Sequence, residues 1–145
     1  MEIASVVLGK LEVEGDAVLT FADGLYGFEV IREYVLVQTD ATLPFAYMQA
    51  KDEPGICLLV ADPFVFNPSY EFDLSAQDTQ ALGNPAPSDL QIWVTVTTEE
   101  EMEQSTMNLL APLVLNTTTK VGRQVVLHES GYQSRTPMFP KKEAE

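Results

Sequence analysis

The sequence predicts a mainly β protein, a small antiparallel β-barrel-like domain with one or two short helices. Three observations favour this class: segments rich in apolar and β-branched residues recur along the chain, turn residues separate them, and strand signals outnumber helical ones. The length of 145 residues suits one domain with a single core. We place that domain at residues 1–139 and expect residues 140–145 to fray.

The strongest strand signal is a hairpin predicted over residues 113–127. Its first arm is apolar and runs into Asn116 and three threonines, and its second arm ends in Val125-Val126-Leu127. Neither of its alternating faces is wholly polar, which places the hairpin in the core sheet. We expect Gly122 in its turn, where φ can be positive. Pro112 is expected at a strand start, an edge or a bulge, because proline lacks the N–H that a ladder needs.

The other strand signals are shorter. They cover residues 2–8, 17–21, 34–37, 43–50, 56–62 and 90–98. Two of them, 43–50 and 56–62, flank the turn dipeptide Pro54-Gly55, which predicts that they pair. The best helix candidate runs from Ser75 to Leu82, since Ser75 can cap its start and Gly83 can end it.

An aromatic segment at residues 62–74 departs from this pattern. Two prolines bracket its first half, and each restrains the preceding residue to extended geometry. We therefore expect a rigid, extended loop that crosses an edge of the sheet. From Tyr70 to Leu74, apolar residues alternate with Glu71 and Asp73, which predicts a strand with one acidic face turned to water.

The charge of the chain is strongly negative and unevenly distributed. The formal net charge is −14, and no Lys or Arg lies between Lys51 and Lys120, although half of the 22 acidic residues do. This argues against direct nucleic-acid binding, which needs basic side chains to meet phosphates, and favours a basic protein partner. The alternative is that the acidity only keeps the protein soluble.

Candidate catalytic and metal-binding groups are scarce. The one cysteine, Cys57, is expected to be a buried, inert thiol, and the one histidine, His128, a surface or structural residue. These two cannot make the usual four-ligand zinc site, although a carboxylate-only cation site stays open. Glu71 and Asp73 could pair for acid–base work, but nothing in the sequence encloses them to separate their pKa values. We therefore predict a protein that is not an enzyme and uses no cofactor.

The amino terminus and the hydropathy pattern favour a cytoplasmic location. Glu2, Lys10 and Glu12 place charges where a signal peptide would be apolar. No apolar run approaches the ~20 residues that a membrane span requires. No membrane partner is expected.

A series of short motifs follows along most of the chain. They are Gly24-Leu25-Tyr26-Gly27-Phe28-Glu29; Pro44-Phe45 with Gln49; Asp62-Pro63-Phe64-Val65-Phe66 through Tyr70-Glu71-Phe72; Thr106-Met107-Asn108-Leu109-Leu110-Ala111-Pro112 with Asn116-Thr117; and Tyr132 with Arg135, Pro137 and Phe139. Each is weak alone, but their order and spacing resemble those of the bacterial flagellar assembly factor FliW family. Two positions depart from the family: Tyr26 stands where proline is common, and Asp62 where asparagine is common.

This resemblance implies a small β-barrel-like protein that binds the RNA-binding carbon storage regulator A and prevents it from repressing flagellin translation. It also implies binding to flagellin, which competes for the factor. Competition at the RNA site and an allosteric effect from an adjacent site both fit the sequence, and the family favours the second. The alternative from another class is a small-ligand-binding β-barrel, with the aromatic residues 64–72 at its mouth.

We place the partner-binding surface on the acidic edge formed by residues 66–73. The predicted contact residues are Phe66, Tyr70, Glu71, Asp73, Met107 and Asn108. Aromatic anchors beside carboxylates on a proline-stiffened backbone suit an interface, because little ordering entropy is lost on docking. Alternatively, Phe66, Tyr70 and Phe72 belong to the core, and the carboxylates are exposed in either case. The acidic run from Glu99 to Glu103 is the next candidate surface.

Overall fold

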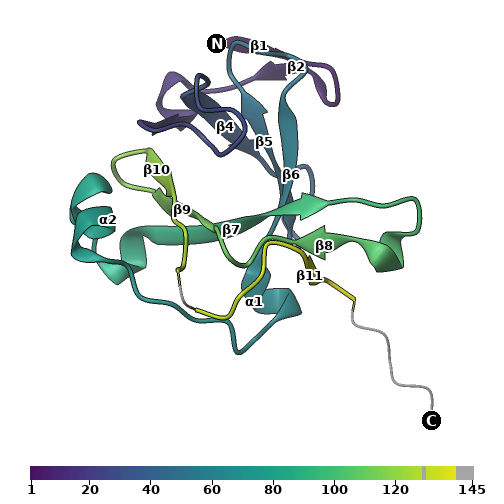
Figure 1. Cartoon of the computed structure of the whole chain (residues 1–145). Coiled ribbons are helices and arrows are strands. Elements are labelled where there is room, and N and C mark those ends of the chain that lie inside the picture. Colours follow the sequence, from purple (N-terminus) through teal and green to yellow (C-terminus); the bar gives the residue numbers. More distant parts are fainter. Residues whose placement is uncertain (129, 140–145) are drawn as a thin grey trace.

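Seven strands close into a barrel in the computed structural model, which describes residues 1–128 and 130–139 (Figure 1). Around the ring they are β7 (Leu90–Thr97), β6 (Cys57–Ala61), β5 (Phe45–Ala50), β4 (Glu33–Val37), β3 (Val18–Phe21), β10 (Val121–Gln124) and β9 (Leu113–Asn116), which pairs back onto β7. These pairs are antiparallel, except that β3 and β10 are parallel. The prediction of a mainly antiparallel β-barrel is confirmed.

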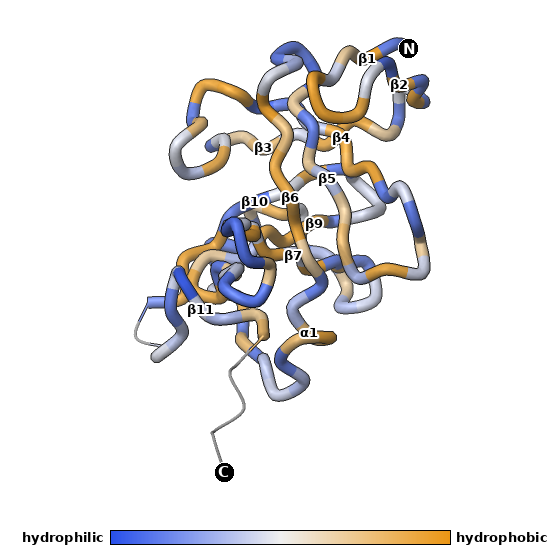
Figure 2. The backbone as a smooth tube through the Cα atoms, turned by 90° about the vertical axis from the view of Figure 1, so that its right-hand side faces the viewer, coloured by the Kyte–Doolittle hydropathy of each residue, from blue (hydrophilic) through white to orange (hydrophobic). Residues whose placement is uncertain are grey.

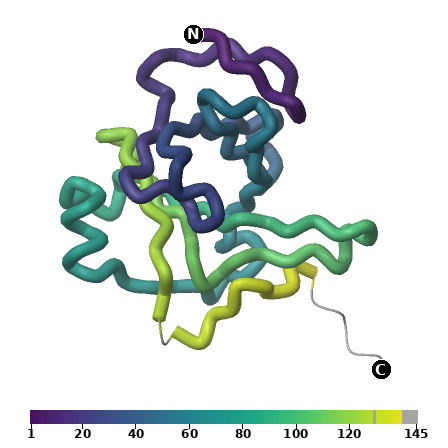
Figure 3. Tube along the Cα trace, turned by 45° about the horizontal axis from the view of Figure 1, so that its top comes forward, coloured from purple at the N-terminus to yellow at the C-terminus, as the bar shows by residue number. Residues whose placement is uncertain are grey.

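The remaining elements lie outside the ring. They are the hairpin of β1 (Glu2–Ser5) and β2 (Gly9–Glu12), the sheet extension of β8 (Thr106–Met107) and β11 (Thr136–Pro137), and the helices α1 (Pro63–Phe66) and α2 (Ala76–Ala81). Short 3-10 turns lie at Gly15–Ala17, Pro87–Asp89 and Met102–Gln104. Figure 3 shows the β7–β8 arm projecting beyond the barrel, with the C-terminal strand below it. None of the helices in the described part of the chain has the length and hydrophobicity to cross a membrane.

Large side chains fill the inside of the barrel. Alternate residues of each strand point inward, as the period of two requires, and Phe21, Tyr34, Met48, Leu113 and Leu115 are each at most 1% exposed. The rings of Phe21 and Tyr34 meet edge to face, with centroids 5.6 Å apart. A barrel interior packed in this way favours a protein partner over the small-ligand alternative.

A second apolar cluster lies outside the barrel, against the outer face of β7 and β9. Trp93 belongs to the inner cluster and its neighbour Val94 to the outer one, so β7 is buried on both faces. The same holds for β9, where all four residues are buried. The segments that cover this face contribute Tyr70, Leu82 and Leu127, among others. The expectation that the predicted hairpin lies in the core sheet is therefore confirmed for residues 113–124, whereas residues 125–127, predicted as part of its second arm, form no strand.

The predicted turn of that hairpin was misplaced. Its arms are β9 and β10, and the turn lies at residues 117–120, where Lys120 has the positive φ of 61°. Gly122 lies within β10 instead. A Cβ atom there would be 2.5 Å from the ring of Phe21, so glycine is needed for close packing and not for a turn. Pro112 directly precedes β9, as predicted for a strand start.

The prediction of a wholly extended loop over residues 62–74 is wrong in its first half. Pro63 occupies the first position of α1, where its missing N–H costs nothing, and the carboxylate of Asp62 caps the helix by accepting the N–H of Phe64. The predicted strand from Tyr70 to Leu74 is also wrong, because this segment pairs with no other strand among the described residues. Its alternation of buried and exposed side chains is nevertheless as predicted.

The strand predicted over residues 2–8 ends at Ser5, because residues 6–8 form the turn of a hairpin whose second strand, β2, was not predicted. Two other predicted features agree with the structure. β5 and β6 pair across Pro54-Gly55, with Tyr47 opposite Leu59. α2 begins after Ser75, whose hydroxyl accepts the N–H of Asp78. Residues 140–145, predicted to fray, lie outside the described residues, and the single-domain boundaries stay a prediction.

The one cysteine and the one histidine of the chain differ in their exposure. Cys57 was expected to be buried, but it lies half-buried on the outer side of β6, where desolvation raises the pKa of its thiol. A raised pKa keeps the thiol protonated and poorly nucleophilic. His128 was expected to be a surface or a structural residue, and its exposed side chain agrees with the first of these roles.

Candidate functional site

A groove runs between the segment that links α1 to α2 and the chain around the end of β10. One wall is formed by residues 71–78 and the other by residues 123–128, and the enclosed volume is about 680 Å³. We call it the acidic groove, because three carboxylates of the described residues line it. Its lining residues are Tyr26, Glu71, Phe72, Asp73, Ser75, Gln77, Asp78, Arg123, Gln124, Val125, Val126, Leu127, His128, Ser130 and Tyr132.

Tyr70 anchors the first wall to the core. Its side chain is 3% exposed, and its hydroxyl donates a hydrogen bond to the carbonyl of Leu109 at 2.7 Å. Its ring meets that of Tyr132 edge to face, with centroids 4.7 Å apart. Desolvation, and then the nearby Tyr132, raise the pKa of Tyr70. The hydroxyl is therefore a fixed donor at neutral pH.

Tyr132 in turn holds the backbone of Glu71. The Tyr132 hydroxyl lies 3.2 Å from the amide nitrogen of Glu71, whose N–H it accepts, and 3.2 Å from the Glu71 carbonyl, to which it donates. Because the flanking Tyr70 and Phe72 point toward the protein, the side chain of Glu71 points to solvent. Asp73 repeats the pattern two residues later and is also exposed. The fold thus presents two carboxylates from a fixed backbone.

The third carboxylate of the groove is neutralised, but the first two are not. Arg123 donates to Asp78 and to Asp23, each at 2.7 Å. The hydrogen bond that Arg123 donates to Asp78 is the main cause that raises the pKa of Arg123. Among the residues that the structure describes, neither Glu71 nor Asp73 has an ion-pair partner. Their negative charge is available to a ligand.

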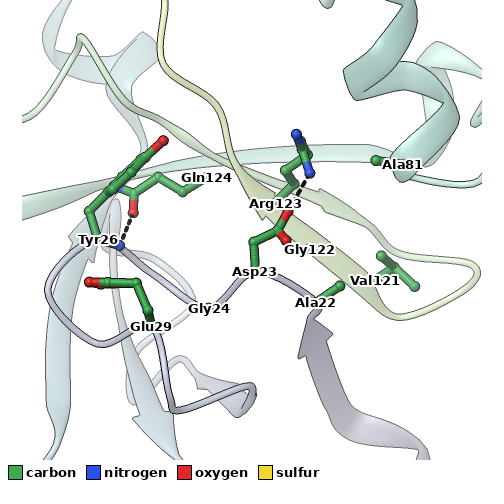
Figure 4. A pocket seen from close by; sticks show the side chains of 10 residues that line it. All are labelled: Ala22, Asp23, Gly24, Tyr26, Glu29, Ala81, Val121, Gly122, Arg123 and Gln124. Atoms are coloured by element: carbon green, nitrogen blue, oxygen red, sulfur yellow. Dashed lines mark hydrogen bonds and ion pairs between the residues drawn. The ribbon is translucent and has the colours of Figure 1, made fainter.

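A smaller pocket of about 210 Å³ adjoins the acidic groove (Figure 4). Tyr26, Arg123 and Gln124 line both, and the N–H of Tyr26 donates to the side-chain oxygen of Gln124 at 2.8 Å. The loop that carries Tyr26 depends on Gly24, which has a φ of 67° and whose Cβ would lie 2.5 Å from the carbonyl oxygen of Glu29. One side of this pocket is thus a loop that requires glycine at position 24, and the other side is β10 with the end of α2.

The acidic groove has the chemistry of a surface that binds positively charged side chains. No group of three or more His, Cys, Asp or Glu residues is placed to hold a metal ion within residues 1–128 and 130–139. The exposed carboxylates Glu71 and Asp73 lie beside the half-buried ring of Phe72 and the half-buried Val126. Carboxylates flanked by apolar side chains suit the basic and apolar residues of a protein partner.

The structure separates the six predicted contact residues into three pairs: exposed, buried and half-buried. Glu71 and Asp73 are exposed, whereas Tyr70 and Met107 are 3% and 2% exposed and belong to the core. Burial leaves little of these two side chains accessible to a docked partner. Phe66 is half-buried against Phe45, outside the groove.

Asn108 is half-buried and has a structural role. Its side-chain oxygen accepts the N–H groups of Leu110 and Ala111, which shapes the turn before β9. Binding at any of the six positions stays a prediction. Sequence reasoning missed Tyr132 and Arg123 as groove residues, because both reach the groove from elements distant in sequence. Tyr132 stands in the series of motifs, but nothing there places it against Glu71.

The fold and its motifs can now be compared with known proteins. The family described as FliW protein matches residues 2–138. The chain belongs to the FliW family. A flagellar assembly factor FliW from Syntrophomonas wolfei is 34% identical over 145 residues, which cover 100% of this chain and 93% of that protein. The flagellar assembly factor FliW from Bacillus subtilis is 30% identical over 130 residues, or 90% of this chain and 91% of that one.

A solved structure supports the same assignment. The crystal structure of a flagellar assembly factor FliW superposes with a TM-score of 0.92 at 29% sequence identity, covering 98% of this chain and 99% of that one. The resemblance deduced from the motifs is therefore confirmed.

Several of the motifs that resemble FliW serve the fold in this chain. Asn116 is 2% exposed, donates from its amide to the carbonyl of Leu82 at 2.7 Å, and accepts the N–H groups of Thr118 and Thr119. It thereby ties the β9–β10 turn to the end of α2. A FliW motif position is thus not by itself an interface position, and exposure has to decide which residues meet a partner.

Proposed function

We propose that this chain is a cytoplasmic flagellar assembly factor that acts by binding other proteins and catalyses no reaction. Its acidic groove receives the basic, RNA-binding carbon storage regulator A and prevents that regulator from repressing flagellin translation. The chain also binds flagellin, which competes with the regulator for it. Relatives that carry the name flagellar assembly factor support the first part of this proposal, and the regulator and flagellin follow from the family resemblance.

One observation carries the choice of surface: Glu71 and Asp73 are exposed and unpaired among the described residues, on a backbone that Tyr132 holds. An RNA-binding protein presents Lys and Arg, so two fixed carboxylates attract it and lose little entropy when it docks. The formal net charge of −14 adds a long-range attraction that accelerates association.

The test is the double charge reversal Glu71→Lys with Asp73→Lys. Surface changes of this kind alter the free energy of unfolding by less than about 1 kcal/mol. Binding to purified carbon storage regulator A should weaken by about ten-fold or more at low salt, mainly through slower association, and the difference should shrink as salt rises. Stopped-flow or surface plasmon resonance measurements over a salt series give both rate constants.

Glu14→Lys with Asp16→Lys is a matched control. It makes the same change in charge at the same spacing, on an exposed turn beside β2, at the other end of the molecule from the acidic groove (Figure 1). This control should lose only the small part of the affinity that net charge contributes. The interface would lie elsewhere if the two double variants lost affinity equally, or if a folded Glu71→Lys, Asp73→Lys protein bound normally. The acidic run from Glu99 to Glu103 would then be the next surface to test.

A further inference from the structure

The outer face of the barrel is apolar on one side where no element of the described chain covers it fully. Ala46, Met48 and Leu58 point into the barrel, so the alternating Phe45, Tyr47 and Leu59 point outward. An antiparallel sheet with a face toward water usually carries polar residues there. Figure 2 looks at this side of the molecule, and the tube of β6 is apolar over its length.

These outward residues form the floor of a groove. Tyr47 and Leu59 lie directly opposite each other on β5 and β6, and Val96 of β7 lines the same groove. Each of these side chains is half-buried. The groove encloses about 200 Å³, and none of the described residues lines both it and the acidic groove. We call it the apolar groove.

Two exposed side chains stand on its sides. Leu43, in the loop before β5, is 51% exposed, and Met102, in the turn after β7, is 60% exposed. Single exposed apolar residues are ordinary on protein surfaces. These two instead converge from separate loops on one apolar floor, which is the arrangement typical of a protein-binding patch.

The size of the apolar groove indicates what it can hold. Pockets for drug-sized or cofactor-sized molecules usually exceed ~300 Å³. At about 200 Å³, this groove suits one or two large apolar side chains presented by a protein segment. Methionine at the rim adds adaptable contact, since its side chain fits differently shaped partners.

The charge around the groove determines the kind of segment. Asp40 lines it, and hydrogen bonds from Thr42 lower the pKa of this carboxyl, so it is ionised at neutral pH. Met102 lies within the acidic run from Glu99 to Glu103, whose residues are all exposed. A second copy of this chain would bring the same acids together, which disfavours self-association here.

We propose that the apolar groove binds an amphipathic segment of another protein, one that inserts large apolar side chains between Leu43 and Met102 and carries Lys or Arg beside them. This surface is separate from the acidic groove, so the protein has two docking sites of different chemistry. Loss of either one should leave the other intact.

The probe for this proposal is a synthetic helical peptide with leucine at i, i+3, i+4 and i+7 and lysine at most other positions. The control peptide has serine in place of each leucine and keeps the same charge. With methionine methyl groups labelled with ¹³C, the leucine peptide should shift the NMR signal of Met102. It should leave Met48, inside the barrel, and Met1, which is 45% exposed at the other end of the chain, unchanged.

Affinity is measured by fluorescence anisotropy with the variant Leu43→Ser, Met102→Ser. Both positions are exposed loop residues, so the variant should fold, and it should bind the leucine peptide about ten-fold more weakly or worse. The matched control is Val6→Ser, Val30→Ser, which removes apolar side chains that are 77% and 90% exposed elsewhere and should bind normally.

Four results would overturn the proposal. Equal binding of the serine peptide would show attraction by charge alone. Normal binding by the Leu43→Ser, Met102→Ser variant, or no binding of the leucine peptide to the native protein, would exclude the groove as the site. A Met102 signal that shifts with protein concentration, without peptide, would identify a second copy of the chain as the occupant.

Discussion

Tyr34 provides a sharp test of the barrel interior. Its side chain on β4 is fully buried, and its hydroxyl has no hydrogen-bond partner among the described residues. Desolvation raises the pKa of Tyr34 from 10.0 to about 12. Both features mean that the hydroxyl group is poorly accommodated in the folded protein, and most poorly when it is ionised.

The expected effect of Tyr34→Phe follows in two parts. An unpaired buried hydroxyl costs about 1–3 kcal/mol, so its removal should raise the free energy of unfolding by about 1 kcal/mol near neutral pH, after allowance for the small void left behind. The second part depends on pH. Because the folded-state pKa is raised, the unfolded chain loses the Tyr34 proton first as pH rises above 10.0, and the native protein loses stability from there to about pH 12. At about pH 11 this loss is about 1.4 kcal/mol, and the phenylalanine variant is free of it.

Urea unfolding at about pH 8 and about pH 11 gives both numbers for the native protein and the variant. Tyr26→Phe, at a position 62% exposed, controls for loss of a tyrosine hydroxyl in general. The gap in stability between Tyr34→Phe and the native protein should widen by about 1.4 kcal/mol between the two pH values. A variant less stable than the native protein at about pH 8 would show that the hydroxyl is hydrogen-bonded in solution, and a gap that does not widen would show that burial does not raise the pKa of Tyr34; either result would refute the reasoning.

Two further predictions concern close contacts. Gly122→Ala should lower the free energy of unfolding, measured in urea, by about 1–3 kcal/mol, because its Cβ would lie 2.5 Å from the Phe21 ring. Gly55→Ala should be nearly neutral, because a Cβ atom added at Gly55 would have no described atom within 4 Å apart from its chain neighbours. A large effect at both glycines would point to backbone strain in place of packing. Asp78 and Asp23 both pair with the guanidinium of Arg123, but the side chain of Asp78 is 17% exposed and that of Asp23 is 76% exposed. Because solvent weakens the exposed pair, Asp78→Asn should destabilise the protein by about 1 kcal/mol and Asp23→Asn by less than about 0.5 kcal/mol. Thermal unfolding with salt titration would contradict this ranking if Asp23→Asn proved the costlier change.

The strands were predictable because their signals are local. Alternation with period two marks β5 and β6, and Pro54-Gly55 marks the turn between them. α2 was predictable for the same reason, since Ser75 and Gly83 lie at its two ends. Local signals also explain why Glu71 and Asp73 were correctly expected to be exposed.

The errors arose where a distant contact decides the structure. Gly122 looked like a turn residue, but it is required by the ring of Phe21, which belongs to a strand near the start of the chain. The segment 62–66 is the exception, because its cause is local: the carboxylate of Asp62 accepts the N–H of Phe64, two residues away, and caps a four-residue helix where the prolines suggested extended chain. The acidic groove needs Tyr132, whose contact with Glu71 spans 61 residues and leaves no pattern in either segment.

The parallel pairing of β10 with β3 has a consequence for how the protein folds. β10 follows all the other ring strands in sequence, and it joins β9 on one side to β3 on the other, with Val121 opposite Thr20. During synthesis, the sheet therefore keeps two open edges until β10 has left the ribosome. Open edges pair with other chains, and pairing over such a sequence distance is slow. A nascent chain that stalls before β10 should thus be the species most prone to aggregate, and ring closure should be the late, rate-limiting step of refolding.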